Sequence, residues 1–365
     1  MIGEKVIVIG GGPAGLLTSL YIDRYDVVIY EEHSSVGKPK HCAGLVGEKI
    51  AKRLTSILGS KIIDNKYNEI RFYTPRGKFE LYFKKPIIYH VNRPLLEEVI
   101  LDKVLSKGHE IIYNVKVKPG NRPDIVIVDG REVRGYKIIA CDGPYSLFRR
   151  KYFRPYKQHL IGIHYIYRTK NLDENMIQIL YNSLTPDFFQ WVTPLDTDTV
   201  MIGFATLTYQ VHPDKIVEYI SRKVGLELGS KIEVYGGAIP VDKPLKKPIV
   251  DNVLFLNGDA IPVTKPYTGG GLLGISILSP ALGKSIDSGD LSIFERIYGI
   301  LKSRINYEYF ATILTRKIGY WIPPYIVSFM YRLGILDHSD YDNHYRLFLK
   351  SLPLTPYMIM KILYP

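Results

Sequence analysis

The chain has 365 residues, of which 46% are hydrophobic and 23% are charged, a composition typical of a soluble globular enzyme. Its 48 Lys and Arg residues outnumber 36 Asp and Glu, giving a net charge of +12. This excess suits an anionic membrane surface, a phosphorylated substrate or an acidic electron-transfer protein, or simply a lysine-rich solvated surface. No nucleic-acid-binding motif accompanies the charge, so nucleic acid is not an expected partner.

The cysteine content and the hydropathy pattern indicate a cytoplasmic protein. Cys42 and Cys141 are the two cysteines, too few for a disulfide framework or for the four thiolates of an iron–sulfur cluster. No apolar run approaches the roughly 18 residues that span a bilayer. The first expected strand begins so close to Met1 that no room is left for a signal or transit peptide.

Residues 5–31 predict a strand, a glycine turn, a helix and a second strand. The apolar, β-branched run at 5–9 is typical of a strand buried on both faces. Gly10, Gly12 and Gly15 then form G-x-G-x-x-G. The first glycine allows the turn, the second lets the backbone approach a pyrophosphate, and the third lets the helix pack against the strand.

The rest of this unit completes the pattern of a dinucleotide site. A helix is expected from about Pro13 to residue 25, so that its N-terminus, around Ala14, faces the pyrophosphate. The second strand ends at Glu31, 21 residues after Gly10, where a carboxylate accepts hydrogen bonds from ribose hydroxyls. Glu31 and the adjacent Glu32 are therefore candidate cofactor ligands.

The remaining elements alternate between helices and two kinds of strand. Helices are expected at 47–58, 94–107, 213–224 and 266–287, followed by a helical, Tyr-rich tail over 291–365. A hairpin covers 69–83, and buried or short strands cover 110–117, 124–128, 136–140 and 252–260. Strands at 160–168, 176–181, 188–193 and 199–207 have no helices between them, so they should pair antiparallel, with a further strand at 231–239.

This order predicts an α/β (α+β) protein with three parts. Residues 1–150 and 245–290 form a discontinuous Rossmann-type nucleotide-binding domain. Residues 151–244, with part of 60–90, form an inserted antiparallel-sheet substrate domain, and 291–365 form a helical C-terminal region. The tail is expected either to cap the sheet or to contact a membrane surface.

Four sequence signatures occur in a recognisable order. These are GGGPAG at 10–15, CAG at 42–44, CDGPYS at 141–146 and NGDAIPVTKPYTGGGL at 257–272, with FFQWVTP at 188–194 between the last two. With them, the chain resembles the geranylgeranyl reductase family, within the p-hydroxybenzoate hydroxylase-like FAD superfamily. The resemblance covers roughly residues 1–285. The family usually continues its Trp-x-Phe-Pro stretch with lysine, whereas Leu195 follows Pro194 here, which leaves the substrate open.

The resemblance implies that the cofactor is FAD. Asp259, at the end of a buried strand, would accept a hydrogen bond from the ribityl chain. The helix that starts near Leu272 would turn its positive end towards the flavin. By the same alignment the cofactor ligands are expected at Gly10, Gly12, Pro13, Ala14, Gly15, Glu31, Glu32, Cys42, Ala43, Gly44, Arg93, Val115, Asp142, Gly143, Asp259, Gly270, Gly271 and Leu272. For several of these a structural role is the alternative: a surface ion pair for Arg93, a core position for Val115, and a turn for Asp142.

The substrate is expected to lie in an aromatic tunnel above the flavin. The residues proposed to line it are Phe189, Trp191, Tyr165, Tyr181 and Tyr267, with ordinary sheet core as the alternative for each one. In the resembling enzymes Cys42 lies beside the isoalloxazine ring, so it is the candidate catalytic residue, although a small thiol is by default a small hydrophobe. His41 and His164 are lone histidines and are interpreted as structural. No metal-ligand cluster is expected.

The resemblance implies an FAD-dependent reductase that saturates C=C bonds of a geranylgeranyl-type chain on an archaeal membrane lipid precursor. Two alternatives stay open: a flavin-dependent monooxygenase or halogenase, and an electron-transfer flavoprotein that reduces a quinone. FFQWVTP lacks the first Trp of the halogenase W-x-W-x-I-P pattern. The expected electron donor is an acidic protein such as ferredoxin or transiently bound NAD(P)H. The expected partners are a prenylated lipid and an anionic membrane surface, with the protein peripheral at the inner face.

Overall fold

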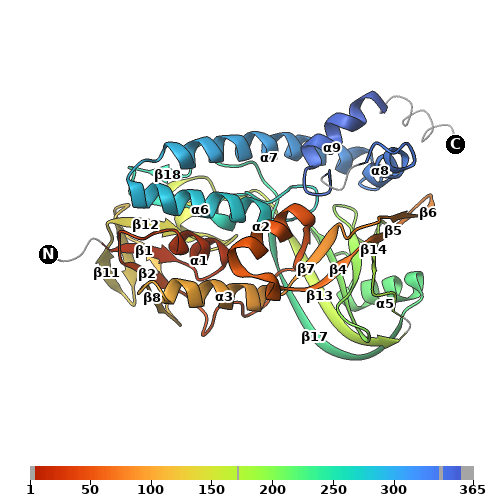
Figure 1. Ribbon diagram of the computed structural model, residues 1–365, viewed down its shortest axis with the longest axis horizontal. Helices are drawn as coiled ribbons and strands as arrows, with labels where there is room; N and C mark the ends of the chain where they lie inside the picture. The colour runs from red at the N-terminus through yellow and green to blue at the C-terminus, as the bar shows by residue number, and fades with distance from the viewer. Residues whose placement is uncertain (1–4, 171, 337–339, 355–365) are drawn as a thin grey trace.

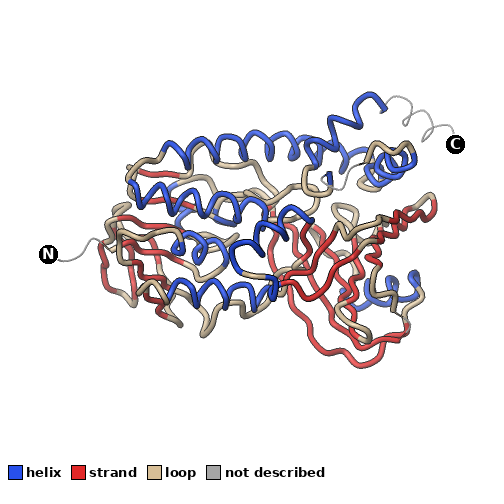
Figure 2. Tube along the Cα trace, viewed as in Figure 1, coloured by secondary structure: helices blue, strands red, loops and turns tan. Residues whose placement is uncertain are grey.

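The computed structural model describes residues 5–170, 172–336 and 340–354. They form two parts that lie side by side, each built around a β-sheet (Figure 1). Long helices run alongside the first sheet, whereas the part that holds the second sheet consists mainly of strands and loops (Figure 2). The helices are α1 (Pro13–Leu20), α2 (Glu48–Leu58), α3 (Arg93–Leu105), α4 (Leu147–Tyr152), α5 (Pro213–Val224), α6 (Leu272–Ser288), α7 (Ser292–Ile318), α8 (Ile322–Arg332) and α9 (His344–Ser351). Among the described residues, no helix is both long and apolar enough to cross a membrane.

The first sheet has six strands, five of them parallel. In spatial order they are β18 (Ile249–Val250), β19 (Leu254–Leu256), β12 (Lys137–Ala140), β1 (Val6–Ile9), β2 (Val27–Tyr30) and β8 (Glu110–Ile112), with β18 antiparallel to β19. All four residues of β1 and of β2 are buried, as β-branched runs in a parallel sheet should be. Helices α1, α3 and α6 pack together beside this sheet, and α7 packs on α6.

The second sheet has seven strands and lies beside the first (Figure 1). Its order is β17 (Glu227–Pro240), β13 (His159–Lys170), β16 (Thr199–Thr206), β15 (Gln190–Pro194), β14 (Met176–Leu180), β5 (Glu69–Thr74) and β6 (Gly77–Tyr82). The hairpin β5–β6 joins it at one edge, so residues 69–82 extend the inserted sheet. The four strands expected to pair antiparallel, β13 to β16, do so, whereas the parallel pairing of β14 with β5 was not predicted.

Two three-stranded sheets complete the fold. One consists of β3 (Leu45–Gly47), β7 (Ile88–Val91) and β4 (Ile63–Tyr67), and the other of β11 (Arg131–Arg134), β10 (Ile125–Val128) and β9 (Lys118–Pro119). The expected strand at 110–117 is therefore shorter, ending at 112, and β11 was not predicted. The α/β (α+β) fold class is confirmed, whereas the domain limits stay predictions and residues 355–365 of the tail lie outside the described part.

Local sequence explains where the helices begin and end. Asn92 caps α3 by accepting a hydrogen bond from Leu95 N at 3.2 Å, and Pro94 occupies the first turn. In α5, Pro213 starts the helix and Gly225 ends it in the left-handed conformation, with φ of 78°. Helix α1 ends at Leu20, about one turn earlier than expected.

Candidate functional site

The glycine turn after β1 has the geometry that a phosphate-binding turn needs. Gly10 has φ of +99°, and a Cβ there would lie 2.4 Å from the Cys141 carbonyl oxygen. A Cβ on Gly15 would lie 2.1 Å from the Gly10 carbonyl oxygen, so α1 approaches β1 more closely than any side chain allows. At Gly12, by contrast, a Cβ would meet no described atom within 4 Å. The space in front of α1 is therefore open where a pyrophosphate would lie.

Glu31 lies at the end of β2 beside this turn, and its carboxylate is already hydrogen-bonded. Gly11 N donates to Oε2 at 2.6 Å, and His33 approaches Oε1 through its backbone N at 2.9 Å and through Nδ1 at 2.6 Å. The Glu31 carbonyl oxygen accepts from Val115 N at 3.0 Å, which brings Val115 to the same place. Glu32 instead pairs with Lys116 at the surface, at 3.2 Å. His33 was not predicted, although its position two residues after Glu31 could have suggested it.

Three expected cofactor ligands from separate parts of the chain come together at a buried charge cluster. Arg93, at the start of α3, donates from Nη2 to Glu97 Oε1 at 2.6 Å. Burial disfavours the Arg93 charge, but Glu97 and the adjacent Cys42 raise the pKa of Arg93 overall. Asp259 lies within reach of the Arg93 charge. Burial raises the pKa of Asp259, while Arg93 and a 3.3 Å hydrogen bond from Thr264 oppose the shift.

This cluster contains an unsatisfied donor that fits a polar ligand. Arg93 Nε is buried and has no hydrogen-bond partner among the described residues. Cys42 is exposed and free, and its Sγ accepts from Gly44 N at 3.4 Å. Gly44 has φ of +71° and its Cβ would lie 2.4 Å from the Val91 carbonyl oxygen, so the CAG loop follows β7 closely. Buried donors without partners are rare in proteins, and a phosphate or flavin oxygen would satisfy this one.

The start of α6 closes the same site from the other side. A Cβ on Gly271 would lie 3.5 Å from Asp259 Oδ1, and no side chain caps the first turn of the helix. Its free N–H groups therefore face the Asp259 region. Gly270 precedes this turn, and Leu272, the first helical residue, is buried. A Cβ on Gly258 would lie 2.6 Å from that of Ala14, which connects the glycine turn to the same region. Residues 10–15, 42–44, 93 and 259–272 thus lie close together, although more than 200 residues separate the first and last.

The turn after β12 carries Asp142 and Gly143. Asp142 Oδ2 accepts from Leu147 N at 2.9 Å, whereas Oδ1 is buried without a partner among the described residues. Burial raises the pKa of Asp142, and hydrogen bonds from Ser146 and Leu147 oppose this. Cys141, next to it, is buried and free. Gly143 has φ of +74°, and a Cβ there would meet no described atom within 4 Å.

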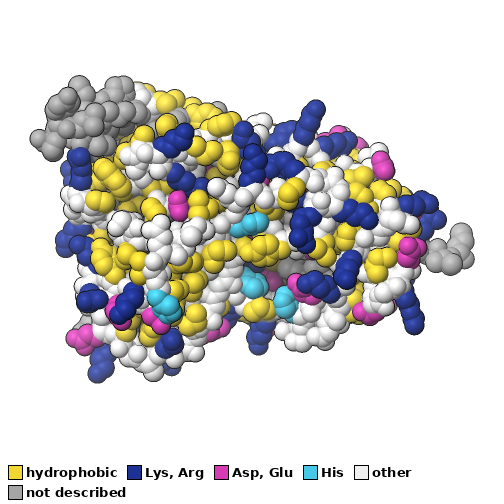
Figure 3. Space-filling model, turned by 180° about the vertical axis from the view of Figure 1, so that it is seen from behind, with side chains coloured by type: hydrophobic (Ala, Val, Ile, Leu, Met, Phe, Trp, Pro, Cys, Tyr) yellow, Lys and Arg dark blue, Asp and Glu magenta, His cyan; other side chains and the backbone are white. Residues whose placement is uncertain are grey.

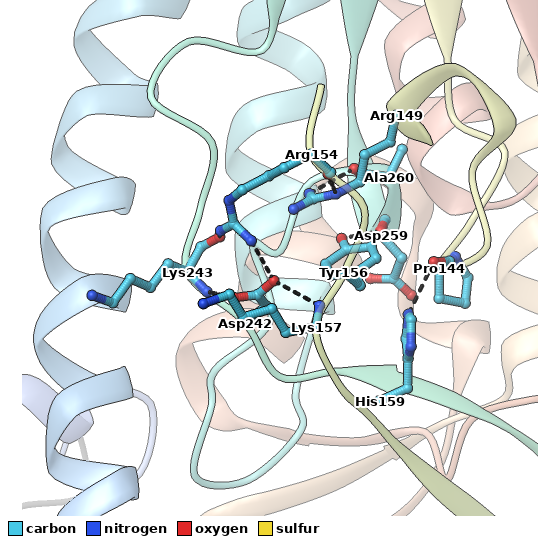
Figure 4. Close-up of polar contacts among 10 residues, drawn as sticks. All are labelled: Pro144, Arg149, Arg154, Tyr156, Lys157, His159, Asp242, Lys243, Asp259 and Ala260. Carbon is cyan, nitrogen blue, oxygen red and sulfur yellow. Dashed lines mark hydrogen bonds and ion pairs between the residues drawn. The ribbon is translucent and has the colours of Figure 1, made fainter. Parts of the chain in front are cut away.

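A network that was not predicted fixes the strand end at Asp259 (Figure 4). Arg149 is fully buried and donates to the Ala260 and Arg154 carbonyl oxygens at 3.2 and 3.0 Å. Its guanidinium lies 3.7 Å from the centre of the Tyr156 ring. The Tyr156 hydroxyl in turn donates to the Asp259 carbonyl oxygen at 2.5 Å. An arginine in an α4 helix of ordinary composition gives no sequence signal of such a role.

Four of the five expected substrate residues lie in one aromatic cluster. The Tyr181 and Tyr267 hydroxyls are 3.4 Å apart, and Phe189 packs against both Tyr181 and Trp191, with ring centres 5.8 and 5.7 Å apart. Tyr320, from the C-terminal region, stacks on Tyr267 at 4.6 Å. The cluster adjoins the start of α6, since a Cβ on Gly269 would lie 3.4 Å from the ring of Phe188.

The prediction for Tyr165 is wrong, because this residue lies on the other face of the second sheet. Its ring packs in the core beneath α5, and its hydroxyl donates to Asp214 Oδ1 at 2.8 Å. Side chains alternate along β13, so the neighbouring His164 takes the face that Tyr165 was expected to occupy. Neighbouring residues of a strand face opposite sides, so assigning the wrong face to β13 exchanges Tyr165 for His164.

His164 is a polar residue on the face of the second sheet that carries Trp191, where Tyr165 was expected. Its ring stacks on Tyr235 at 4.7 Å and meets Trp191 edge-on at 5.4 Å, and the residue is only 3% exposed. Neither ring nitrogen makes a well-formed hydrogen bond to a described residue, and Trp191 Nε1 is equally unpartnered. Burial lowers the pKa of His164 to about 3. The face of the sheet turned towards Trp191 therefore carries unused hydrogen-bonding groups.

His164→Phe is expected to make the flavin-free protein less sensitive to acid. The unfolded state binds a proton at His164 below about pH 6.5, whereas the folded state does so only near pH 3. The free energy of unfolding therefore falls as the pH drops through this window. Between pH 7 and pH 4.5 we expect His164→Phe to abolish about 2 kcal/mol of that loss, measured by urea unfolding. The exposed control His212→Asn should leave the loss unchanged, and equal acid sensitivity of all three proteins would contradict the assignment.

The comparisons with known proteins agree with this geometry. No protein-family model matches the chain. An uncharacterized protein of Methanocaldococcus jannaschii is 25% identical over 374 residues, covering 95% of this chain and 94% of its own length. A digeranylgeranylglycerophospholipid reductase of Methanosarcina acetivorans is 25% identical over 323 residues, covering 80% of this chain and 79% of its own.

Solved structures share the fold over most of the chain. A geranylgeranyl bacteriochlorophyll reductase-like protein of Thermoplasma acidophilum superposes with a TM-score of 0.73 at 20% identity, covering 93% of this chain and 90% of its own. A flavin-dependent halogenase superposes with a TM-score of 0.58 at 18% identity, covering 85% and 62%. These solved structures show the fold, and the relatives that are named reductases indicate the class, an oxidoreductase with the fold of flavin enzymes. Within this class it is similar to the geranylgeranyl reductases, so the resemblance found in its motifs is confirmed.

Proposed function

We propose that the protein is an FAD-dependent reductase that saturates C=C bonds in geranylgeranyl-type chains of an archaeal membrane lipid precursor. The names of several relatives support this proposal. The observation that carries it is the aromatic cluster of Tyr181, Phe188, Phe189, Trp191 and Tyr267, which adjoins the start of α6 next to Asp259. An apolar wall beside a buried polar site suits a long hydrocarbon chain held against a redox cofactor.

The residues of the buried site fit the parts of FAD. The pyrophosphate would lie against Gly10, Gly12, Gly15 and the start of α1. Glu31 would bind the hydroxyls of the adenosine ribose, in place of its present hydrogen bonds with Gly11 and His33. Arg93 Nε and Asp259 would hold the ribityl and phosphate oxygens. The uncapped start of α6 and residues 42–44 would contact the ring system. Val115, whose backbone N donates to the Glu31 carbonyl oxygen, would lie beside the adenine.

The protein groups around this site would position the alkene and exclude water. Saturation of one bond adds a hydride and a proton, and FAD, when bound and reduced, supplies the hydride. We assign the proton to the Cys42 thiol, which is exposed and therefore exchanges with water, and which lies beside the Arg93 guanidinium. Each saturated bond consumes two electrons from an external donor, an acidic iron–sulfur protein or a reduced nicotinamide. An isolated alkene has no carbonyl to polarise, so positioning is the main contribution of the aromatic cluster.

Mass spectrometry of a prenylated glycerolipid mixture tests this function. The lipids are incubated under argon with dithionite-reduced, flavin-loaded enzyme. Mass gains in steps of roughly 2 Da per saturated bond, absent without flavin, are the expected result. No gain with bound flavin confirmed by its visible spectrum would contradict the proposal. Oxygen-coupled turnover of an aromatic substrate would then favour a monooxygenase or halogenase, with which the chain shares its fold, and flavin-dependent reduction of a quinone would favour electron transfer.

We further propose that the protein contacts an anionic membrane through α7. Phe310, Leu314 and Ile318 are exposed at intervals of four residues along this helix, so they share one side. Lys243 lies 4.3 Å from the Phe310 ring, and Lys and Arg side chains are spread over the molecular surface (Figure 3). Flotation with anionic liposomes at low salt should retain the protein, whereas neutral liposomes or high salt should release it. Failure to bind anionic liposomes would contradict membrane contact.

A further inference from the structure

A cavity of about 350 Å³ lies where the end of α7 meets the second sheet. One wall is the loop between β14 and β15, with Tyr181, Ser183 and Phe188. The other is the chain from the last turn of α7 to Trp321, including Arg316 and Tyr320. The cavity is partly open to solvent, and its walls are both aromatic and polar. A larger groove of about 630 Å³ lies between the hairpin β5–β6 and the end of α5, and Pro75 lines both.

The polar side of this cavity is cationic. Arg316 donates from Nε to the Asp187 carbonyl oxygen at 3.1 Å, which fixes the guanidinium at the cavity wall. Its Nη2 is buried and has no hydrogen-bond partner among the described residues. Lys317 lines the cavity as well and is exposed. The nearby Asp187 carboxylate is bonded to other groups of the protein: it accepts hydrogen bonds from the Thr206 hydroxyl at 3.1 Å and from Leu207 N at 3.3 Å.

A structural role does not account for this arrangement. Arg316 and Lys317 lie in the last turn of α7, where cations complement the negative end of the helix. That role requires only exposed cations near the terminal carbonyl groups. It leaves a buried guanidinium nitrogen without an acceptor, which costs free energy unless a ligand supplies one. A phosphate oxygen is the acceptor that matches a guanidinium best.

The aromatic side of the cavity continues towards the candidate flavin site. Tyr181, Phe188 and Tyr320 line the cavity and also belong to the aromatic cluster. Tyr320 stacks on Tyr267, and Phe188 lies against Gly269 at the start of α6. A row of aromatic rings in contact therefore extends from the cavity at Arg316 to the residues proposed to hold the flavin.

We infer that this cavity binds the phosphate head group of the prenyl lipid, with Arg316 as its main ligand and Lys317 as a second cation. The prenyl chain then extends along Tyr320 and Phe188 towards Gly269. The inference rests on the proposed function, since it names the head group of the same substrate. It makes the protein selective for lipid precursors that carry a phosphate over uncharged prenylated glycerols.

Binding to the oxidised, flavin-loaded protein tests the inference without turnover. The probes are a geranylgeranylated glycerol phosphate, the corresponding uncharged glycerol ether and inorganic phosphate. The fluorescence of Trp191 and Trp321, the two tryptophans of the chain, reports binding, and Trp321 lines the cavity. We expect Arg316→Gln to weaken binding of the phosphate lipid about tenfold or more, the usual loss for a charge-assisted hydrogen bond. Binding of the uncharged lipid should change by less than about twofold.

Two further variants separate a local effect from a general one. Arg304→Gln removes an equal charge from an exposed position on α7 outside the cavity and should leave all affinities unchanged. Arg316→Lys keeps the charge, so it should retain an affinity between those of the wild type and Arg316→Gln even where the glutamine variant is less stable. Equal weakening of both lipids, or no weakening, would overturn the inference. Inorganic phosphate binding as tightly as the phosphate lipid would show a free-anion site instead.

Failure of the head-group inference can be distinguished from failure of the proposed reductase function, because lipid binding and lipid saturation are measured separately. Phosphate selectivity without any mass gain in the lipids would support the cavity and reject the reductase. Saturation of charged and uncharged lipids with equal affinity would support the reductase and reject the cavity.

Discussion

Gly12→Val is expected to abolish flavin binding while leaving the fold intact. Gly12 has φ of −74°, which any residue can adopt, and its Cβ would meet no described atom within 4 Å. A valine there would displace a pyrophosphate from the start of α1 without disturbing protein packing. We expect flavin affinity to fall on the order of 100-fold or more, with an unchanged thermal midpoint for the flavin-free protein. The visible spectrum of the purified protein and a flavin titration measure the first, and calorimetry measures the second.

Gly15→Val is the matched comparison three residues away. Its Cβ would lie 2.1 Å from the Gly10 carbonyl oxygen and 3.1 Å from Val8, so α1 would have to move away from β1. Overpacking of this kind costs about 1–3 kcal/mol or more, and this variant should lose stability as well as flavin. Retention of flavin by Gly12→Val would contradict the assignment of the glycine turn to the pyrophosphate.

The parts of this fold that local sequence determines were predictable. The strand, glycine turn, helix and acidic residue of 5–31 each depend on neighbours within a few positions, and they occur where expected, except that α1 ends about one turn early. Both ends of helix α5 were predicted correctly, because proline marks its start and glycine its end. Alternation of aromatic and β-branched residues likewise located the strands of the second sheet.

What depends on long-range packing could not be predicted. The sequence does not state which face of β13 is turned to the first sheet, and both faces carry aromatic residues, so Tyr165 was assigned to the wrong one. The parallel pairing of β14 with β5 joins strands about 100 residues apart and leaves no local pattern. Arg149 and Arg316 resemble any surface arginine until the chain folds around them. The burial of such a charge can be recognised only from the folded structure.

Arg93→Met is expected to give the largest loss of stability among single substitutions in the site. The Arg93 side chain is only 16% exposed, and it bonds to Glu97, which is 8% exposed and also accepts from Gly37 N at 3.1 Å. Removal of the cation leaves the Glu97 carboxylate buried without its partner. It also removes the charge that opposes the rise in the pKa of Asp259 caused by burial. Loss of one member of a buried ion pair costs about 3 kcal/mol or more. Urea unfolding of the flavin-free protein at pH 7 measures it.

The double variant Arg93→Met/Glu97→Gln separates the buried charge from the lost packing. Neutralising Glu97 removes the uncompensated carboxylate, so the double variant should regain about half or more of the lost stability. The loss in the single variant should also shrink as the pH falls, because burial raises the pKa of Asp259 and its protonation then removes a buried charge. Flavin binding should not recover in the double variant, since Arg93 Nε, the donor proposed to face the cofactor, is still missing. Additive losses in the double variant would show that Arg93 contributes through packing alone, and recovery of flavin binding would remove it from the cofactor site.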